Sequence, residues 1–137
     1  LALIELGRSI DGETCAKASQ INHMAGRTMG RFHEKYDVVL SPTLNKLPVP
    51  IGYFNNGDLG EKIGEFMANT SLFNQTGQPS ISLPLAWSEQ GLPIGIMFSS
   101  AFGKDDLLIR LSGQLEQACP WAQHRAPHHA GAIDEAL

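Results

Sequence analysis

"FNQTGQPSISLP", at residues 73–84, joins a polar stretch to an alternating one and decides how the rest of the chain is interpreted. Polar residues at 74–76 run into Gly77 and Pro79, and both of these residue types are typical of turns. The sequence Ser-Ile-Ser-Leu at 80–83 alternates polar and apolar side chains, which predicts a strand with two serines on one face. We therefore expect a loop that leads directly into a half-buried strand.

Two interpretations of these serines are open. One is a nucleophile with its supporting residues, since functional loops lie at strand ends in α/β folds. The other is that residues 74–76 satisfy backbone groups in a tight turn, while Ser80 and Ser82 are small polar residues of a strand. No serine stands in a Gly-x-Ser-x-Gly turn, and none is followed three residues later by lysine. The sequence therefore favours the turn.

A helix and a strand are expected before this stretch. Asp11 is the expected N-cap, because its carboxylate can accept a hydrogen bond from a backbone N–H of the first turn. An apolar stripe then predicts an amphipathic helix over residues 12–36; its members are Ala18, Ile21, Ala25, Met29, Phe32 and Tyr36. The continuous apolar run at 38–40 predicts a strand buried on both faces, which Pro42 ends.

The elements that follow predict an α/β fold. Residues 43–60 are rich in Pro, Gly and Asn, and a loop of this length is usually functional or flexible. A short helix is expected at 61–68 and a further turn at 71–76. Two strands, at about 80–87 and 92–99, have the spacing of a hairpin, and their prolines Pro84 and Pro93 indicate a bulge, an edge or a strand end. Periodic leucines predict a last helix over 103–118. These strands are too few for a self-sufficient parallel sheet, so the pattern fits one side of a larger sheet.

Composition limits the partners and the location. The 137 residues, 42% hydrophobic and 18% charged, predict one folded domain. A net charge of -4 without a Lys/Arg cluster argues against nucleic acid, and the apolar runs are too short to span a membrane. Cys15 and Cys119 form neither a disulfide framework nor a zinc signature, so a reduced, cytoplasmic setting is the default. The chain begins at Leu1 without a signal-peptide pattern, and we expect a fragment of a longer protein.

No metal site and no cofactor are expected. His124 and His128 have the i, i+4 spacing of a metal pair, but Pro127 breaks the helix that would align them. Glycine-rich dinucleotide and phosphate-loop patterns do not occur. Residues 128–137 have no periodicity and are expected to form a flexible tail after a domain over 1–127.

Several motifs in a fixed order carry a family resemblance. They are "YDVVLSPTL", "FNQTGQPSISLPLAW", "GLPIGIMFSSAFGKDDLLIRLSGQLEQACPW" and the closing "HRAP". Over roughly residues 5–127 the chain resembles the C-terminal part of amidase signature enzymes. The last of these motifs, "PW…RAP", resembles the bacterial branch that includes 6-aminohexanoate cyclic-dimer hydrolases. The resemblance implies part of a mixed sheet flanked by helices, with about three strands and three to four helices in this chain.

The resemblance also implies a chemistry, which is the hydrolysis of amides. In the family a serine attacks the carbonyl, and its proton passes through a second serine, in a cis peptide, to a neutral lysine. Backbone N–H groups of a Gly/Ser-rich loop form the oxyanion hole. That region has no counterpart here, and no catalytic residue is carried over. The residues that match no catalytic role are Ser80, Ser82, Ser99, Ser100, Lys17, Lys35, Lys46, Lys62 and Lys104.

The same resemblance assigns the chain to the wall of a substrate cleft. Met67, Thr70 and Phe73 are the expected contacts to a small amide, together with the loop at 43–60. The A subunits of tRNA-dependent amidotransferases have an acidic residue near Met67, and methionine supplies no such charge, which favours a less polar amide. Three hypotheses stay open: an amidase segment inactive alone, a non-enzymatic binding or scaffold module, and an amidotransferase A subunit. Self-association or a homodimer also stays open.

Overall fold

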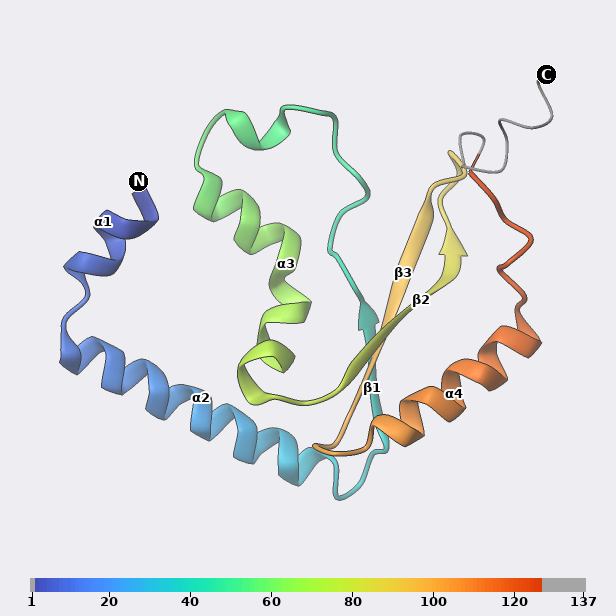
Figure 1. Ribbon diagram of the computed structural model, residues 1–137, viewed down its shortest axis with the longest axis horizontal. Coiled ribbons are helices and arrows are strands. Elements are labelled where there is room, and N and C mark those ends of the chain that lie inside the picture. The colour runs from blue at the N-terminus through green and yellow to red at the C-terminus, as the bar shows by residue number, and fades with distance from the viewer. Residues whose placement is uncertain (1, 127–137) are drawn as a thin grey trace.

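A β-sheet lies at the centre of the computed structural model, which describes residues 2–126 (Figure 1). The elements in chain order are α1 (Ala2–Ser9), α2 (Gly12–Phe32), β1 (Val38–Pro42), the 3-10 helix η1 (Tyr53–Asn55), α3 (Leu59–Thr76), β2 (Ser80–Trp87), β3 (Pro93–Ser100) and α4 (Asp105–Ala118). Figure 1 shows α3 on one side of the sheet and α4 on the other. This mixture of helices and strands confirms the predicted α/β class.

The sheet is antiparallel, and β3 is its central strand. Both β1 and β2 pair with β3, which gives the order β1-β3-β2. Phe98 lies opposite Leu40 and Ile81, whereas Met97 lies opposite a serine in each neighbouring strand. Because directly opposed residues of antiparallel strands share a face, one face of this sheet is apolar and the other carries hydroxyl groups.

The hydrophobic core forms between the apolar face and α4. Leu83, Phe98 and Leu108 are buried together, and Leu111 and Leu115 pack against them from the following turns of α4. This contact confirms the leucine periodicity predicted for the last helix. Since burial of one leucine side chain contributes about 1.5–3 kcal/mol, these contacts fix α4 on the sheet.

The predicted hairpin is confirmed, and its prolines lie where a missing N–H is tolerated. The register between β2 and β3 shifts between Leu83 and Ala86, around Pro84. Pro93 is the first residue of β3. Both positions are irregular or terminal, so neither proline removes a hydrogen bond from the regular part of the ladder.

Helix α2 begins at the predicted cap and ends earlier than predicted. Oδ1 of Asp11 accepts a hydrogen bond from the N–H of Thr14 at 2.8 Å, which confirms the cap. The stripe predicted a helix over 12–36, whereas α2 ends at Phe32. The ring of Tyr36 stacks on Phe32, with 4.6 Å between centroids. The apolar stripe therefore extends to Tyr36, beyond the end of α2, because the rings of Phe32 and Tyr36 still pack together.

The two helical segments predicted before the hairpin are confirmed as two parts of α3 that meet at a kink. At Met67 the backbone is non-helical, with φ of -110° and ψ of 17°, so the helix is interrupted between the two predicted segments. The loop predicted at 74–76 is wrong, because these residues form the last turn of α3. Gly77 ends the helix with φ of 74°, in the left-handed region that glycine adopts at little cost. The predicted loop at 43–60 holds η1 and the first residues of α3.

Two further features differ from the sequence prediction. The first strand was expected to be buried on both faces, yet Leu40 of β1 is 63% exposed, because β1 has one neighbouring strand within the described chain. Helix α1 was not predicted at all. It stands apart from the sheet in Figure 1, and its residues Ile4 and Leu6 are exposed.

The remaining expectations concern the membrane and the end of the chain. Among residues 2–126 there is no helix long and apolar enough to cross a membrane. The tail predicted at 128–137 lies outside the described residues.

Truncation of the core should destabilise the chain. Leu108→Ala should lower the free energy of unfolding by about 2–5 kcal/mol, because a buried side chain leaves a cavity. Ile109→Ala is the matched control, since Ile109 is 67% exposed whereas Leu108 is 3% exposed. Urea unfolding followed by circular dichroism measures both. Equal effects of the two substitutions would contradict the packing of α4 on the sheet.

Candidate functional site

Hydroxyl groups line the face of the sheet that points toward α3. The Oγ atoms of Ser80 and Ser99 are 2.7 Å apart, and Oγ of Ser82 lies 2.5 Å from Oγ1 of Thr43. Either member of each pair can donate the hydrogen bond. Both serines of the predicted strand are therefore bonded to hydroxyls of neighbouring segments, which confirms them as strand residues.

Gly95 makes room for the second hydroxyl pair. A Cβ at this position would lie 2.8 Å from Oγ of Ser82 and 2.9 Å from Oγ1 of Thr43. The N–H of Thr43 donates to the carbonyl oxygen of Gly95 at 2.8 Å, so the two backbones are held at this separation. A side chain at 95 would have to push the hydroxyl pair apart.

Two adjacent hollows are together called the α3–sheet groove, and α3 lines the first of them. The first hollow has a volume of about 250 Å³, and among the residues that line it are Thr70, Phe73, Ser80, Ser82 and Met97. The second has a volume of about 450 Å³ and is lined by residues 42–48, Ser82 and residues 93–95. Ser82 lines both hollows, so the two adjoin at this side chain.

Two of the three predicted substrate contacts lie in this groove. Thr70 is half-buried, Phe73 is buried, and both line the first hollow. Met67 is 45% exposed at the irregular point of α3 and lines neither hollow. The predicted loop contributes residues 43–48 to the second hollow. The structure thus brings Thr70 and Phe73 together with the loop and leaves Met67 outside the groove.

Polar contacts from α3 fix the loop that follows β1. Nδ2 of Asn69 donates to the carbonyl oxygen of Pro42 at 2.9 Å and to Oδ1 of Asn45 at 2.6 Å. Lys46 forms an ion pair with Glu65. As the hydrogen-bond acceptor, the Glu65 carboxylate raises the pKa of the Lys46 ammonium above its ordinary value. Lys46 therefore stays charged and holds the loop on α3.

A second lysine also has a structural role. Nζ of Lys62 donates to the carbonyl oxygen of Tyr53 at 2.6 Å and to that of Asn56, and it lies 4.3 Å from the centroid of the Tyr53 ring. These contacts hold η1 against α3. A general base must be within hydrogen-bond reach of the proton that it removes. Lys62 is bonded to carbonyl oxygens instead, so it does not serve as a base for a serine.

The serines of the described part of the chain lack a base. No serine hydroxyl within residues 2–126 is hydrogen-bonded to a histidine or lysine side chain. Ser100 donates to the backbone oxygen of Lys104 at 3.2 Å, not to its ammonium. Oγ of Ser41 is buried without a hydrogen-bond partner. Within residues 2–126, no serine is therefore hydrogen-bonded to the kind of base that activates a serine nucleophile.

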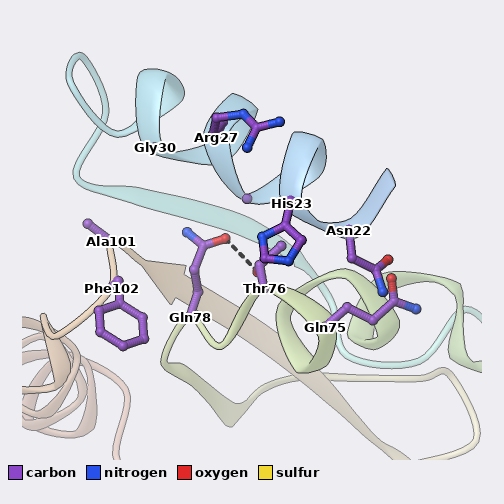
Figure 2. Close-up of a pocket in the computed structure, with 10 residues that line it drawn as sticks. Asn22, His23, Arg27, Gly30, Gln75, Thr76, Gln78, Ala101 and Phe102 are labelled. Carbon is purple, nitrogen blue, oxygen red and sulfur yellow. Dashed lines mark hydrogen bonds between the residues drawn. The ribbon is translucent and has the colours of Figure 1, made fainter. Parts of the chain in front are cut away.

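A third hollow, of about 470 Å³, adjoins the groove (Figure 2). Figure 2 shows His23 and Arg27 of α2 above Thr76 and Gln78. Oε1 of Gln78 accepts from Oγ1 of Thr76 at 3.0 Å, and its Nε2 donates to the carbonyl oxygen of Ser100 at 3.1 Å. Gln78 lines this hollow and the first hollow of the groove, so its carboxamide separates the two.

A fourth hollow, of about 710 Å³, lies beyond the end of α4 and is lined in part by Trp87, Trp121 and His124. The His124 ring stacks on Trp87 with 4.8 Å between centroids. His128, the second member of the predicted histidine pair, lies outside the described residues. Within the described residues, no three His, Cys, Asp or Glu side chains gather as a metal ion would require.

The comparison with known families identifies the class of protein. The family model named Amidase matches residues 3–109, so the chain belongs to the amidase family. The resemblance to amidase signature enzymes, expected from the ordered motifs, is thereby confirmed.

Named relatives are similar over most of this chain. The Mycobacterium tuberculosis protein AmiC, which is named as an amidase, is 39% identical over 110 residues, or 78% of this chain and 23% of AmiC. The 6-aminohexanoate-cyclic-dimer hydrolase of Paenarthrobacter ureafaciens is 32% identical over 120 residues, or 80% of this chain and 24% of that enzyme. A solved structure of 6-aminohexanoate cyclic dimer hydrolase matches with a TM-score of 0.78 at 29% identity, over 90% of this chain and 28% of that chain. The chain thus spans about a quarter of the length of these relatives.

Sequence reasoning did not single out Thr43, Gly95 or Gln78. A glycine inside a strand pattern is the signal that could have found Gly95, because it indicates the close approach of a neighbour. Thr43 becomes its neighbour only through the register between β1 and β3. No local signal indicates that Gln78 lines two hollows, since its partners are set by the end of β3.

A methyl group at Gly95 should disturb the hydroxyl pair. Gly95→Ala should lower the free energy of unfolding by about 1–3 kcal/mol, because the added Cβ overpacks against two short side chains. In a Ser82→Ala background the same change should cost less, because one of the two opposing hydroxyls is gone. A double-mutant cycle by urea unfolding measures this coupling. Additive effects would contradict the close approach at Gly95.

Proposed function

We propose that the chain is the C-terminal portion of an amidase that hydrolyses carbon–nitrogen bonds in small or linear amides in the cytoplasm. In this proposal a serine, a second serine in a cis peptide and a neutral lysine perform the chemistry, and all three belong to a segment outside this chain. The described residues wall the substrate cleft. The observation that carries the proposal is a groove lined by Thr70 and Phe73 in a chain that belongs to the amidase family.

The contents of the groove fit a role in binding. Phe73 offers an aromatic wall, and Thr70 and the strand serines offer groups that can accept or donate hydrogen bonds. An amide substrate presents one N–H donor and one carbonyl acceptor next to apolar carbon chains. The first hollow combines uncharged polar side chains with the apolar Phe73, Ile81 and Met97, and small-molecule sites use such polar groups to orient a ligand. The groove therefore suits an amide whose flanking groups are uncharged.

Met67 and the exposed apolar side chains of α2 help to decide against the amidotransferase and scaffold hypotheses. Methionine supplies no negative charge for the ammonium of an amino-acid substrate, which speaks against an amidotransferase A subunit. A stand-alone scaffold module should cover its apolar side chains, yet Ile21 and Met24 of α2 are 65% and 54% exposed. Both observations favour the amidase portion.

A chimeric enzyme tests this proposal. In it, the segment of the Paenarthrobacter ureafaciens hydrolase that matches this chain is replaced by the corresponding residues of this chain. We expect the chimera to hydrolyse an amide, measured on the cyclic dimer and on an aryl amide, and the isolated chain to hydrolyse neither. Turnover by the isolated chain would contradict the proposal. A chimera with a cooperative thermal transition but no activity would also contradict it.

A matched pair of substitutions in the chimera tests the groove. Thr70→Val removes a hydroxyl that lines the first hollow and should lower kcat/KM by about threefold to tenfold, the effect of one lost hydrogen bond. Ser71→Ala is the control, because Ser71 bonds locally to the carbonyl of Ala68, as Thr70 does to that of Met67, but does not line the hollow. Equal losses would show that Thr70 has no role in the cleft.

A further inference from the structure

The fourth hollow, of about 710 Å³, is larger than either hollow of the α3–sheet groove. Both tryptophans of the chain, Trp87 and Trp121, line it, together with His124 and Arg125. Among the described residues it shares Pro93 with the second hollow of the groove and no other lining residue. The proposed function therefore gives this hollow no role.

The hairpin of β2 and β3 forms one wall of the fourth hollow. Trp87 lies opposite Pro93 in the register, directly before the loop that joins the two strands. Oγ of Ser88 accepts hydrogen bonds from the N–H groups of Gln90 at 3.2 Å and Leu92 at 3.1 Å. The N–H of Ser88 donates to the carbonyl oxygen of Leu92 at 2.8 Å. These bonds close the loop and fix the backbone that carries Trp87.

The segment after α4 forms the other wall. Trp121 packs against the hydrophobic core between the sheet and α4. The N–H of His124 donates to the carbonyl oxygen of Trp121 at 2.9 Å, and the His124 ring stacks on Trp87 with 28° between the ring planes. The segment is thus attached to the core by one ring and to the hairpin by another. The hollow is therefore formed before any ligand enters it.

The charge and the rings of the hollow indicate the kind of ligand. Arg125 is exposed and forms no ion pair within residues 2–126, and no Asp or Glu lines the hollow. A guanidinium binds a carboxylate through two parallel hydrogen bonds, and tryptophan rings favour aromatic partners. Tryptophan also binds cations, but Arg125 would repel a cationic ligand. The lining therefore suits an aromatic carboxylate.

We propose that the fourth hollow is a binding site for a small aromatic carboxylate. The aromatic ring of the ligand lies against Trp87 and Trp121, and its carboxylate accepts hydrogen bonds from Arg125. The volume falls within the range of about 300–1,000 Å³ that is typical of small-molecule sites. The site uses neither the hydroxyl groups of the groove nor a catalytic segment, so it does not rest on the proposed function.

An NMR titration of the 137-residue chain with 2-naphthoate tests the proposal. A nitrogen-labelled sample gives one indole N–H signal for each of the two tryptophans, and both of them line the hollow. We expect both signals to move until the site is saturated. The neutral analogue 2-naphthamide should bind about threefold to tenfold more weakly, because it keeps the rings but loses the charge-assisted bonds to Arg125.

Substitutions separate the charge of the site from its rings. Arg125→Gln should weaken the binding of 2-naphthoate by the same factor and leave that of 2-naphthamide unchanged. Arg110→Gln is the matched control, because Arg110 is an exposed arginine that pairs with Asp106 on α4 and does not line the hollow. Trp87→Leu should weaken the binding of both ligands, and the remaining indole signal of Trp121 reports this loss.

Several outcomes would overturn the proposal. Indole signals that stay unmoved would show that the hollow does not bind the acid. Equal affinities for the acid and the amide, or equal losses for the Arg125 and Arg110 variants, would exclude a carboxylate site at Arg125. Indole signals that move when residues 127–137 are deleted, in the absence of ligand and with tighter binding of 2-naphthoate afterwards, would assign the hollow to that segment of the chain instead.

Discussion

The alternation of side chains along β3 is the constraint on which the rest of the structure depends. Because β3 pairs with strands on both sides, its residues decide what each face of the sheet contains. Phe98 faces the leucines of α4, while Gly95 and Met97 face the groove. A slip of one residue would exchange the two faces, which would bury the hydroxyls in the core and expose Phe98.

The groove depends on this register and on the contacts between α3 and the loop after β1. Asn69 and the Lys46–Glu65 pair join α3 to that loop, and the Thr43–Ser82 hydroxyl pair joins the loop to β2. Ser82, one of the two serines considered as a nucleophile from the sequence, is used in one of these connections. No serine of the described residues is hydrogen-bonded to a lysine or histidine side chain, which supports the proposal that this chain is a portion of an amidase whose chemistry lies elsewhere.

Elements with local signals could be predicted, and those that depend on distant contacts could not. The Asp11 cap, the hairpin and the leucine face of α4 follow from neighbouring residues. The division of α3 at Met67 agrees with the two predicted segments, whereas the contacts of α3 with residues 42–46, far away in the sequence, could not be predicted. Thr70 and Phe73 were placed through the family motif, whereas the hydroxyl pair over Gly95 depends on strand register and could not be foreseen.

The most direct test of this account is a chemical probe of the serines in the isolated chain. A fluorophosphonate phosphonylates serines that an adjacent base activates, with loss of fluoride, and intact-mass spectrometry detects the adduct. We predict no stoichiometric mass increase, because the serine hydroxyls in the described residues are bonded to other hydroxyls or to backbone groups, or have no partner. A stoichiometric adduct on Ser82, or on any other serine, would contradict the claim that this chain forms the cleft but not the catalytic machinery.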